Sequence, residues 1–201
     1  GESGSGIARL EGHRSVIRSL AFAPDRPLVA TTAKDRTARI WDIEASKLVR
    51  TIELEGWDSN SCAFSADGRY LAQGGILNRP TLVYETTDWS LVQEFQGHTG
   101  WVNNIAFHPL SGHLVTAASD AQGRILDVET GEELALLRGH LAGILSIEFL
   151  PDGRIVTAAK DATVRIWSQD GEHLVTHVEY DENGWLTFEP GGRYVAGGEA
   201  E

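Results

Sequence analysis

A recurring pattern of residues constrains the fold of this 201-residue chain more than any other feature. Gly-His pairs begin at Gly12, Gly97 and Gly139, and Gly56-Trp57 fills the same place between the first two, at steps of 44, 41 and 42 residues. A repeat period of about 20 to 50 residues is typical of folds in which one supersecondary unit is stacked many times. The chain is therefore expected to consist of several copies of one such unit.

Each unit shows the same order of short segments. An alternating apolar run is followed by a turn with Pro, Asp or Gly, and then by small and branched residues, as in 28–32, 114–118 and 155–159. A second turn leads to a third run, which ends near Trp41, Tyr84, Leu126 or Trp167, and a fourth run leads to the next unit. Turn signals at this spacing predict four strands per unit and no helix. Stacking such sheets radially covers their apolar faces. We therefore predict an all-β fold, a β-propeller of four-stranded antiparallel blades with about four and a half blades present.

The pattern also divides the chain. Residues 1–6 are expected to be a linker, and 7–201 a propeller segment with repeats near 12–55, 56–96, 97–138 and 139–179 and a partial unit at 180–201. Ile7–Leu10 is expected to be the last strand of a preceding blade. Open blade edges invite further pairing, so the chain is expected to belong to a larger ring, to form a homo-oligomer, or to pair with a chain that completes the ring. The absence of methionine likewise suggests a piece of a longer protein.

Composition excludes several function classes. The formal net charge of −12 repels polyanions, which argues against binding to nucleic acid or an acidic membrane surface. The chain lacks the apolar run of about 20 residues that a membrane-spanning helix needs. Cys62 is the single cysteine, which favours a reducing, cytoplasmic location. His173 and His177 fall on a predicted strand without metal-ligand spacing, and no phosphate-binding loop is found, so no metal or cofactor is expected.

With the Gly-His start, the turn Asp and the Trp-Asp end in order, the unit resembles the WD (tryptophan-aspartate) repeat over residues 7–201. The resemblance implies a structural hydrogen-bond network in each blade. Taken alone, a histidine, a hydroxyl and an aspartate also suggest a nucleophilic triad, but a set that recurs is better explained as bracing than as an active site. The implied members are His13, Thr31, Asp35 and Trp41; His98, Thr116 and Asp120; and His140, Thr157, Asp161 and Trp167.

Two units depart from the pattern. Leu126 replaces the tryptophan of the third unit, so its network is expected to end early or to close through water. In the second unit, Trp57, Gly74, Asn78 and Tyr84 are assigned to the four network positions, and this blade is expected to be the least regular.

The resemblance also implies that partners bind on one rim of the propeller, through three side chains per blade. Trp101 has two open interpretations, a binding hot spot or a side chain packed against a neighbouring blade. Two of the three lysines fall on the rim, which suggests a partner segment with an apolar anchor and acidic flanks. The positions are Val16, Arg18 and Lys34; Asp58, Asn60 and Leu77; Trp101, Asn103 and Ser119; and Gly143, Leu145 and Lys160.

These observations predict a non-catalytic scaffold that binds a partner protein or peptide on the propeller rim. The alternative is the interaction or regulatory module of a larger multidomain enzyme, of the signalling or protease type, whose catalytic domain is not in this chain. An enzyme would need a non-repeating residue set converging on the channel, and the sequence contains none that we can identify.

Overall fold

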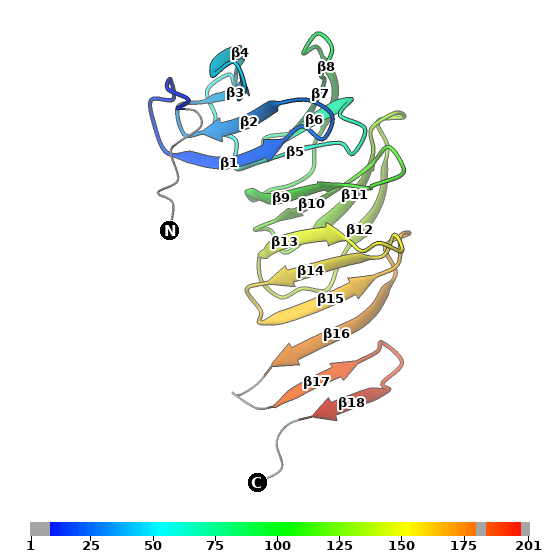
Figure 1. Ribbon diagram of the computed structural model, residues 1–201. Coiled ribbons are helices and arrows are strands. Elements are labelled where there is room, and N and C mark those ends of the chain that lie inside the picture. The colour runs from blue at the N-terminus through cyan, green and yellow to red at the C-terminus, as the bar shows by residue number, and fades with distance from the viewer. Residues whose placement is uncertain (1–8, 180–183, 198–201) are drawn as a thin grey trace, which may run out of the picture.

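The computed structural model describes residues 9–179 and 184–197, and these contain eighteen strands and no helix (Figure 1). Blade one contains β1 (Ile17–Phe22), β2 (Leu28–Ala33), β3 (Thr37–Asp42) and β4 (Lys47–Glu53). Blade two contains β5 (Ser61–Phe64), β6 (Tyr70–Gly74), β7 (Thr81–Glu85) and β8 (Leu91–Phe95). Blade three contains β9 (Val102–Phe107), β10 (His113–Ala118), β11 (Gly123–Asp127) and β12 (Glu133–Leu137). Blade four contains β13 (Ile144–Phe149), β14 (Ile155–Ala159), β15 (Thr163–Trp167) and β16 (His173–Glu179).

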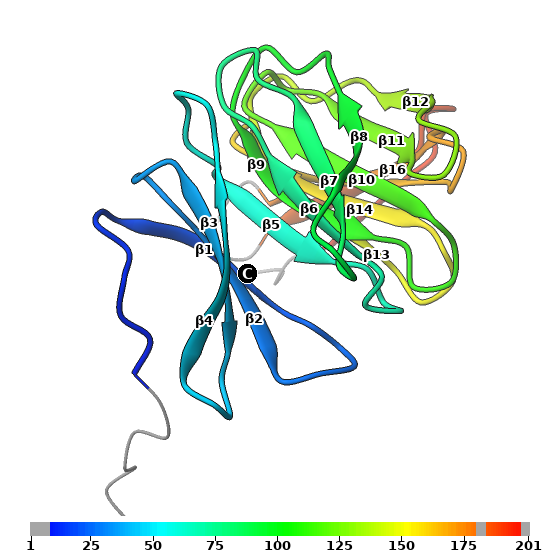
Figure 2. The same cartoon turned by 90° about the horizontal axis from the view of Figure 1, so that it is seen from above.

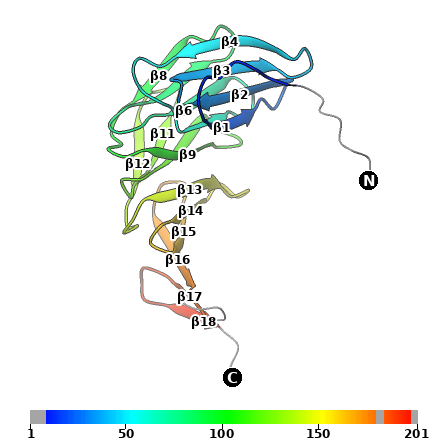
Figure 3. The ribbon, with the colours of Figure 1, turned by 90° about the vertical axis from the view of Figure 1, so that its left-hand side faces the viewer.

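Every strand in a blade pairs antiparallel with the one before it in the chain. The first strands β1, β5, β9 and β13 lie next to one another, and the sheets fan out from them (Figure 2). Blade one and the last strands lie at opposite ends of the resulting arc (Figure 3). The predicted all-β architecture of four-stranded antiparallel blades in a partial propeller is confirmed.

The hydrophobic core lies between blades. Ile125 and Val115 of blade three pack with Ile147 and Trp167 of blade four, and all four side chains are buried. Similar clusters join blades two and three, and blades one and two. Because both faces of an interior blade are covered by neighbours, its strands are apolar on both sides.

Blade one shows what happens without a preceding neighbour. Leu20 of β1 is 58% exposed, whereas Ile105 and Ile147, at the same place in β9 and β13, are 4% and 0% exposed. The face of blade one that the repeat pattern assigns to a neighbouring blade is therefore open to solvent.

Side chains also join the first strands of neighbouring blades. The Ser61 hydroxyl donates to the Val102 carbonyl over 2.9 Å, and the Asn103 amide donates to the Ile144 carbonyl over 2.7 Å. The Ile147 N–H donates to the side-chain oxygen of Asn104 over 2.8 Å. Hydrogen bonds of this kind fix the register between blades as well as within them.

The partial fifth unit differs from the prediction. Its strands β17 (Trp185–Phe188) and β18 (Tyr194–Gly197) do not begin a separate blade, because β17 pairs with β16 and extends the blade-four sheet to six strands. The unpaired edge of β16 offers main-chain donors and acceptors that β17 satisfies. The expected start of this unit at Tyr180 lies outside the described residues.

At the N-terminal end, Arg9 and Leu10 are not in a strand, so the expected strand Ile7–Leu10 is not formed over its described half. Ile7 itself, and the expected linker 1–6, lie outside the described residues. Within 9–179 and 184–197, no helix is long and apolar enough to cross a membrane, and no group of three or more His, Cys, Asp or Glu side chains is placed to hold a metal ion.

Candidate partner-binding rim

A chain of hydrogen bonds braces blade one behind its rim. The Asp35 carboxylate can only accept, so His13 Nδ1–H donates to it over 2.9 Å. The free Nε2 of His13 then accepts from the Thr31 hydroxyl over 2.7 Å. The Thr31 oxygen in turn accepts from the Trp41 indole N–H over 2.8 Å. The structure thus brings the four residues assigned to this network together.

Blade four repeats the arrangement, with His140 3.0 Å from Asp161 and 2.7 Å from Thr157, and with the Trp167 indole donating to Thr157 over 2.9 Å. The Thr157 hydroxyl lies in a fully buried side chain. A substrate cannot reach a hydroxyl in this position, so the histidine, hydroxyl and aspartate brace the blade rather than form a nucleophilic site.

In blade three the network is shorter. His98 lies 2.9 Å from Asp120 and 2.8 Å from Thr116. Leu126 stands where the other blades have a tryptophan, and its buried side chain packs in the core with Leu114. Among the described residues, no side chain continues the network beyond Thr116.

The turn aspartates are strongly acidic. Burial on its own raises the pKa of Asp35, but hydrogen bonds from the Arg14 N–H, His13 and Thr37 outweigh it and lower the pKa to about 2. The pKa values of Asp120 and Asp161 are lowered to about 2 against the same effect of burial, by bonds from their own histidines and main-chain N–H groups. Burial also lowers the pKa of His140. All three carboxylates are therefore charged at neutral pH.

These aspartates hold the loops on which the rim positions lie. Each accepts a main-chain N–H from the residue after the histidine: Arg14, Thr99 or Leu141, at 2.8 to 2.9 Å. The residue before each aspartate also donates its main-chain N–H to a rim position at the start of the first strand. These pairs are Lys34 with Val16, Ser119 with Trp101, and Lys160 with Gly143, at 2.9 to 3.0 Å.

The exposure of the rim positions varies. Val16, Leu77 and Leu145 are 61%, 59% and 48% exposed, and Lys34, Ser119 and Lys160 are also exposed. Arg18, Asp58, Asn60, Trp101 and Asn103 are half-buried. Gly143 is buried and has no side chain to offer, and an added Cβ would lie 2.9 Å from the Cα of Ser119. Its assignment as a rim contact is therefore wrong, because this position is needed for the close approach of blades three and four.

Two contacts link rim positions of different blades. The Arg18 guanidinium lies over the Trp101 ring, 5.1 Å from its centroid, a geometry that gives an attractive cation–π interaction. The Asn60 amide donates to the Asn103 side-chain oxygen over 3.4 Å. Trp101 is thus partly packed, against a rim residue of blade one rather than inside a neighbouring sheet, and it remains half-exposed.

Blade two lacks the network, as expected. One of the four residues assigned to its network positions from the sequence is wrong. Gln73, and not Gly74, occupies the threonine position, because Gln73 pairs with Cys62 and Leu82 as Thr31 pairs with Leu20 and Arg39. The segment from this position to the third strand is one residue longer in blade two than in the other blades. An alignment of the repeats from the sequence alone is therefore shifted by one residue here. Trp57 and Tyr84 are buried at the histidine and tryptophan positions, and Asn78 is exposed at the aspartate position.

Sequence reasoning missed further recurring residues. The Thr37 and Thr163 hydroxyls donate to Asp35 and Asp161 over 2.8 and 2.7 Å. Arg39, Arg124 and Arg165 each follow a turn aspartate by four residues, and their spacing is the signal by which they can be found. Leu82 stands in this place in blade two.

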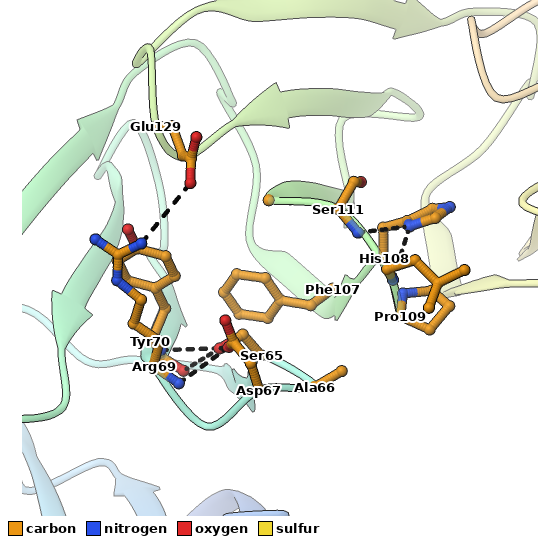
Figure 4. A pocket seen from close by; sticks show the side chains of 12 residues that line it. Ser65, Ala66, Asp67, Arg69, Tyr70, Phe107, His108, Pro109, Ser111 and Glu129 are labelled. Carbon is orange, nitrogen blue, oxygen red and sulfur yellow. Dashed lines mark hydrogen bonds and ion pairs between the residues drawn. The ribbon is translucent and has the colours of Figure 1, made fainter.

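A hollow of about 410 Å³ lies at the opposite end of the blades, between the β5–β6 and β9–β10 turns (Figure 4). Arg69 lies over the Tyr70 ring at 4.8 Å and within 3.7 Å of Glu129, and His108 lies on the other side of the hollow. The Nδ1 of His108 accepts N–H groups from Leu110 and Ser111, both at 3.1 Å. These groups are used within the protein, so the rim is the better candidate site.

Comparison with known proteins agrees with the fold. The family model "WD domain, G-beta repeat" (WD40) matches residues 4–42, 89–127 and 131–168. The chain is 29% identical over 171 residues to transcription initiation factor TFIID subunit 5 of Caenorhabditis elegans, a match that covers 83% of this chain and 26% of that protein. It is 25% identical over 198 residues to nuclear distribution protein nudF of Aspergillus niger, covering 94% and 38%. The chain thus spans about a quarter to two fifths of the length of these curated relatives.

Two solved structures share the architecture. The crystal structure of the computationally designed Ika4 protein superposes with a TM-score of 0.74 at 26% identity, over 83% of this chain and 99% of that one. The structure of U3-55K has a TM-score of 0.79 at 23% identity, over 94% and 63%, and supports the fold alone. The family model matches more than half of the chain, in the order of the repeats that the sheets display. The chain belongs to the WD40 repeat family.

Proposed function

We propose that this chain is a non-catalytic interaction module that binds a partner protein or peptide on its rim. Members of the WD40 family are generally protein-interaction scaffolds. The observation that carries the proposal is the Arg18–Trp101 contact, which presents a half-exposed aromatic ring and a guanidinium together at the rim. Tryptophan, tyrosine and arginine side chains are enriched among the hot spots of protein interfaces, where partner binding desolvates them.

The charge of the rim supports a proposal about the partner's chemistry. Lys34 and Lys160 are exposed on the rim of a chain whose formal net charge is −12, and Arg18 adds a third positive group. Leu145 and Val16 are exposed apolar members of the same rim set. We therefore expect the partner segment to place an apolar side chain against Trp101 and carboxylates near the basic groups.

A peptide-display selection tests this function. The chain is immobilised and random 12-residue peptides are selected in parallel against the parent and the double variant Arg18→Glu, Lys34→Glu. Peptides with an aromatic or branched residue next to Asp or Glu should be enriched on the parent and not on the variant. Arg154→Glu, Arg193→Glu is the matched control, because both arginines are exposed in turns away from the rim set. Equal enrichment on parent and rim variant would refute the proposal.

A further inference from the structure

Blade two has a hollow of about 400 Å³ on the side that faces blade one, here called the blade-two hollow. Its apolar wall includes Trp57, Leu82 and Tyr84. Trp57 and Leu82 replace the histidine and the arginine of the other three blades, and Tyr84 replaces the tryptophan of blades one and four. The hollow therefore lies where the other three blades place their bracing network.

An arginine occupies this place in the other blades. Cross-strand pairing aligns Arg39 with Thr31, Arg124 with Thr116 and Arg165 with Thr157, and in blade two it aligns Leu82 with Gln73. Leu82 ends in methyl groups and is shorter than arginine, so blade two lacks a guanidinium at the one position where the other three blades share one.

The loop glycines show where those guanidinium groups lie. A Cβ placed on Gly12, Gly97 or Gly139 would meet the guanidinium of the arginine in its own blade. In blade three, that group donates to the Gly97 carbonyl over 2.9 Å. A Cβ placed on Gly56, the corresponding residue of blade two, would have no atom within 4 Å. No side chain of blade two therefore lies beside its loop glycine as the guanidinium groups do in the other three blades.

The surroundings of the corresponding place in blade two suit a cation. Glu94 lies directly across from Leu82 on the neighbouring strand, and Glu53 and Glu55 lie at the edge of the hollow, against one positive group, Arg79. Tyr84 and Trp57 supply aromatic surface, and in blade one the Arg39 guanidinium lies 5.9 Å from the ring centroid of Trp41, at the position that Tyr84 takes here. Carboxylates beside aromatic rings form a favourable environment for a guanidinium.

The substitutions in blade two do not build a different internal network. Gln73 is fully buried, and neither its amide oxygen nor its amide nitrogen has a hydrogen-bond partner among the described residues. An unsatisfied buried amide costs stability. The changes at these positions therefore weaken the bracing of the blade while opening a lined hollow at its side.

We propose that the blade-two hollow binds the side chain of an arginine from a partner protein, in the place that the chain's own arginines take in the other three blades. The hollow is a second contact site, separate from the rim, and it takes the opposite charge. A partner that uses both sites would present acidic groups to the rim and one arginine to the side of blade two.

Nuclear magnetic resonance with a minimal probe tests the proposal. N-acetyl-arginine amide is titrated into the ¹⁵N-labelled chain, and N-acetyl-citrulline amide, which has nearly the same shape without the charge, serves as the control. The arginine compound should shift the Trp57 indole N–H resonance saturably, and the citrulline compound should bind at least about tenfold more weakly because charge-assisted bonds are lost. Equal binding of the two compounds, or arginine-specific shifts at Trp101 but not at Trp57, would overturn the proposal. The second result would leave the rim function intact.

Two variants separate binding from folding. Leu82→Arg restores the repeat pattern and should abolish the arginine-induced shift by filling the place from within. Glu94→Gln should weaken binding about threefold, as expected for one exposed ion pair, whereas Glu172→Gln, an exposed carboxylate in the β15–β16 turn, should leave it unchanged. Circular dichroism confirms the fold of each variant, and Glu94→Gln decides the question if Leu82→Arg does not fold. Undiminished binding by Glu94→Gln or by folded Leu82→Arg would contradict the proposal.

Discussion

The Arg18 guanidinium of blade one lies 5.1 Å from the ring centroid of Trp101 in blade three, so two rim residues of non-adjacent blades contact each other across blade two. This contact both positions Trp101 and leaves part of its ring exposed. It connects the stability of the blade arrangement with the composition of the proposed binding surface.

The contact predicts a measurable coupling energy. Arg18→Ala and Trp101→Ala should each lower the free energy of unfolding, and the double variant should lose about 0.5 to 1 kcal/mol less than the sum of the two, as expected for a partly exposed cation–π pair. Urea denaturation of the parent and the three variants gives this value. Strict additivity would show that the two residues do not interact in solution.

The bracing network makes Thr157 important for stability. Thr157→Val keeps the shape of the side chain but leaves the Trp167 indole N–H and the His140 ring nitrogen without their partner. Unfolding free energy should fall by about 2 to 3 kcal/mol, because both groups are buried. Thr99→Val, on an exposed loop, is the control and should change stability by less than about 0.5 kcal/mol. A small effect at Thr157 would refute the bracing role.

Removing a buried polar side chain from blade two should not lower stability, in contrast to Thr157→Val. Because the Gln73 amide is buried without a partner, Gln73→Leu removes an unsatisfied polar group from an apolar surrounding. The variant should be as stable as the parent or more stable by about 1 kcal/mol. Denaturation in guanidinium chloride measures the change, and a loss of more than about 1 kcal/mol would show that the amide is in fact satisfied.

The low pKa values of the turn aspartates predict acid sensitivity. Since folding lowers the pKa of Asp161 from 3.8 to about 2, the folded state binds the proton less well than the unfolded chain does. The charged aspartate therefore contributes to the free energy of unfolding, on the order of 2 kcal/mol for each such aspartate. This contribution is complete above about pH 5 and is lost as the pH falls through 4 towards 2.

Asp161→Asn isolates one of these contributions. Urea midpoints measured from pH 6 to pH 2.5 should fall less steeply for the variant than for the parent between pH 4 and pH 2.5. Burial lowers the pKa of His140, so protonation of His140 also favours unfolding. This effect occurs over a higher pH range, which begins below about pH 6.5. Parallel curves below pH 4 would contradict the assigned role of Asp161.

Much of the fold follows from the sequence because one unit recurs. The positions of Gly12, Asp35 and Trp41 predict strands, turns and bracing, and their copies confirm each other. The sequence assignment of the threonine position in blade two was wrong by one residue, because the loop before β7 is one residue longer than in the other blades. Nothing in the sequence marks Gln73 as a buried residue. The pairing of β17 with β16 depends on which sheet edge is free, a tertiary property that a local pattern does not encode.

The candidate sites also differ in how far the sequence predicts them. The rim positions could be placed from the spacing of the first strand and the turn aspartate, because main-chain hydrogen bonds such as Lys34 to Val16 follow from the repeated hairpin geometry. The contact of Arg18 with Trp101 could not be predicted from the sequence, because it depends on how blades one, two and three are arranged relative to one another. The blade-two hollow is visible in sequence only as the exchange of a recurring arginine for Leu82.

We propose that the recurring residues hold the blades together and that the varying rim residues bind the partner. Isothermal titration calorimetry tests this division of roles, with a display-selected peptide titrated into the parent, Trp101→Ala and Gln73→Leu and the unfolding free energy of each protein measured in parallel. Trp101→Ala should weaken binding at least about tenfold, as a hot spot does, while the protein remains folded, and Gln73→Leu should bind like the parent. Unchanged binding by folded Trp101→Ala would show that the rim does not bind the peptide through this residue and would refute the proposal.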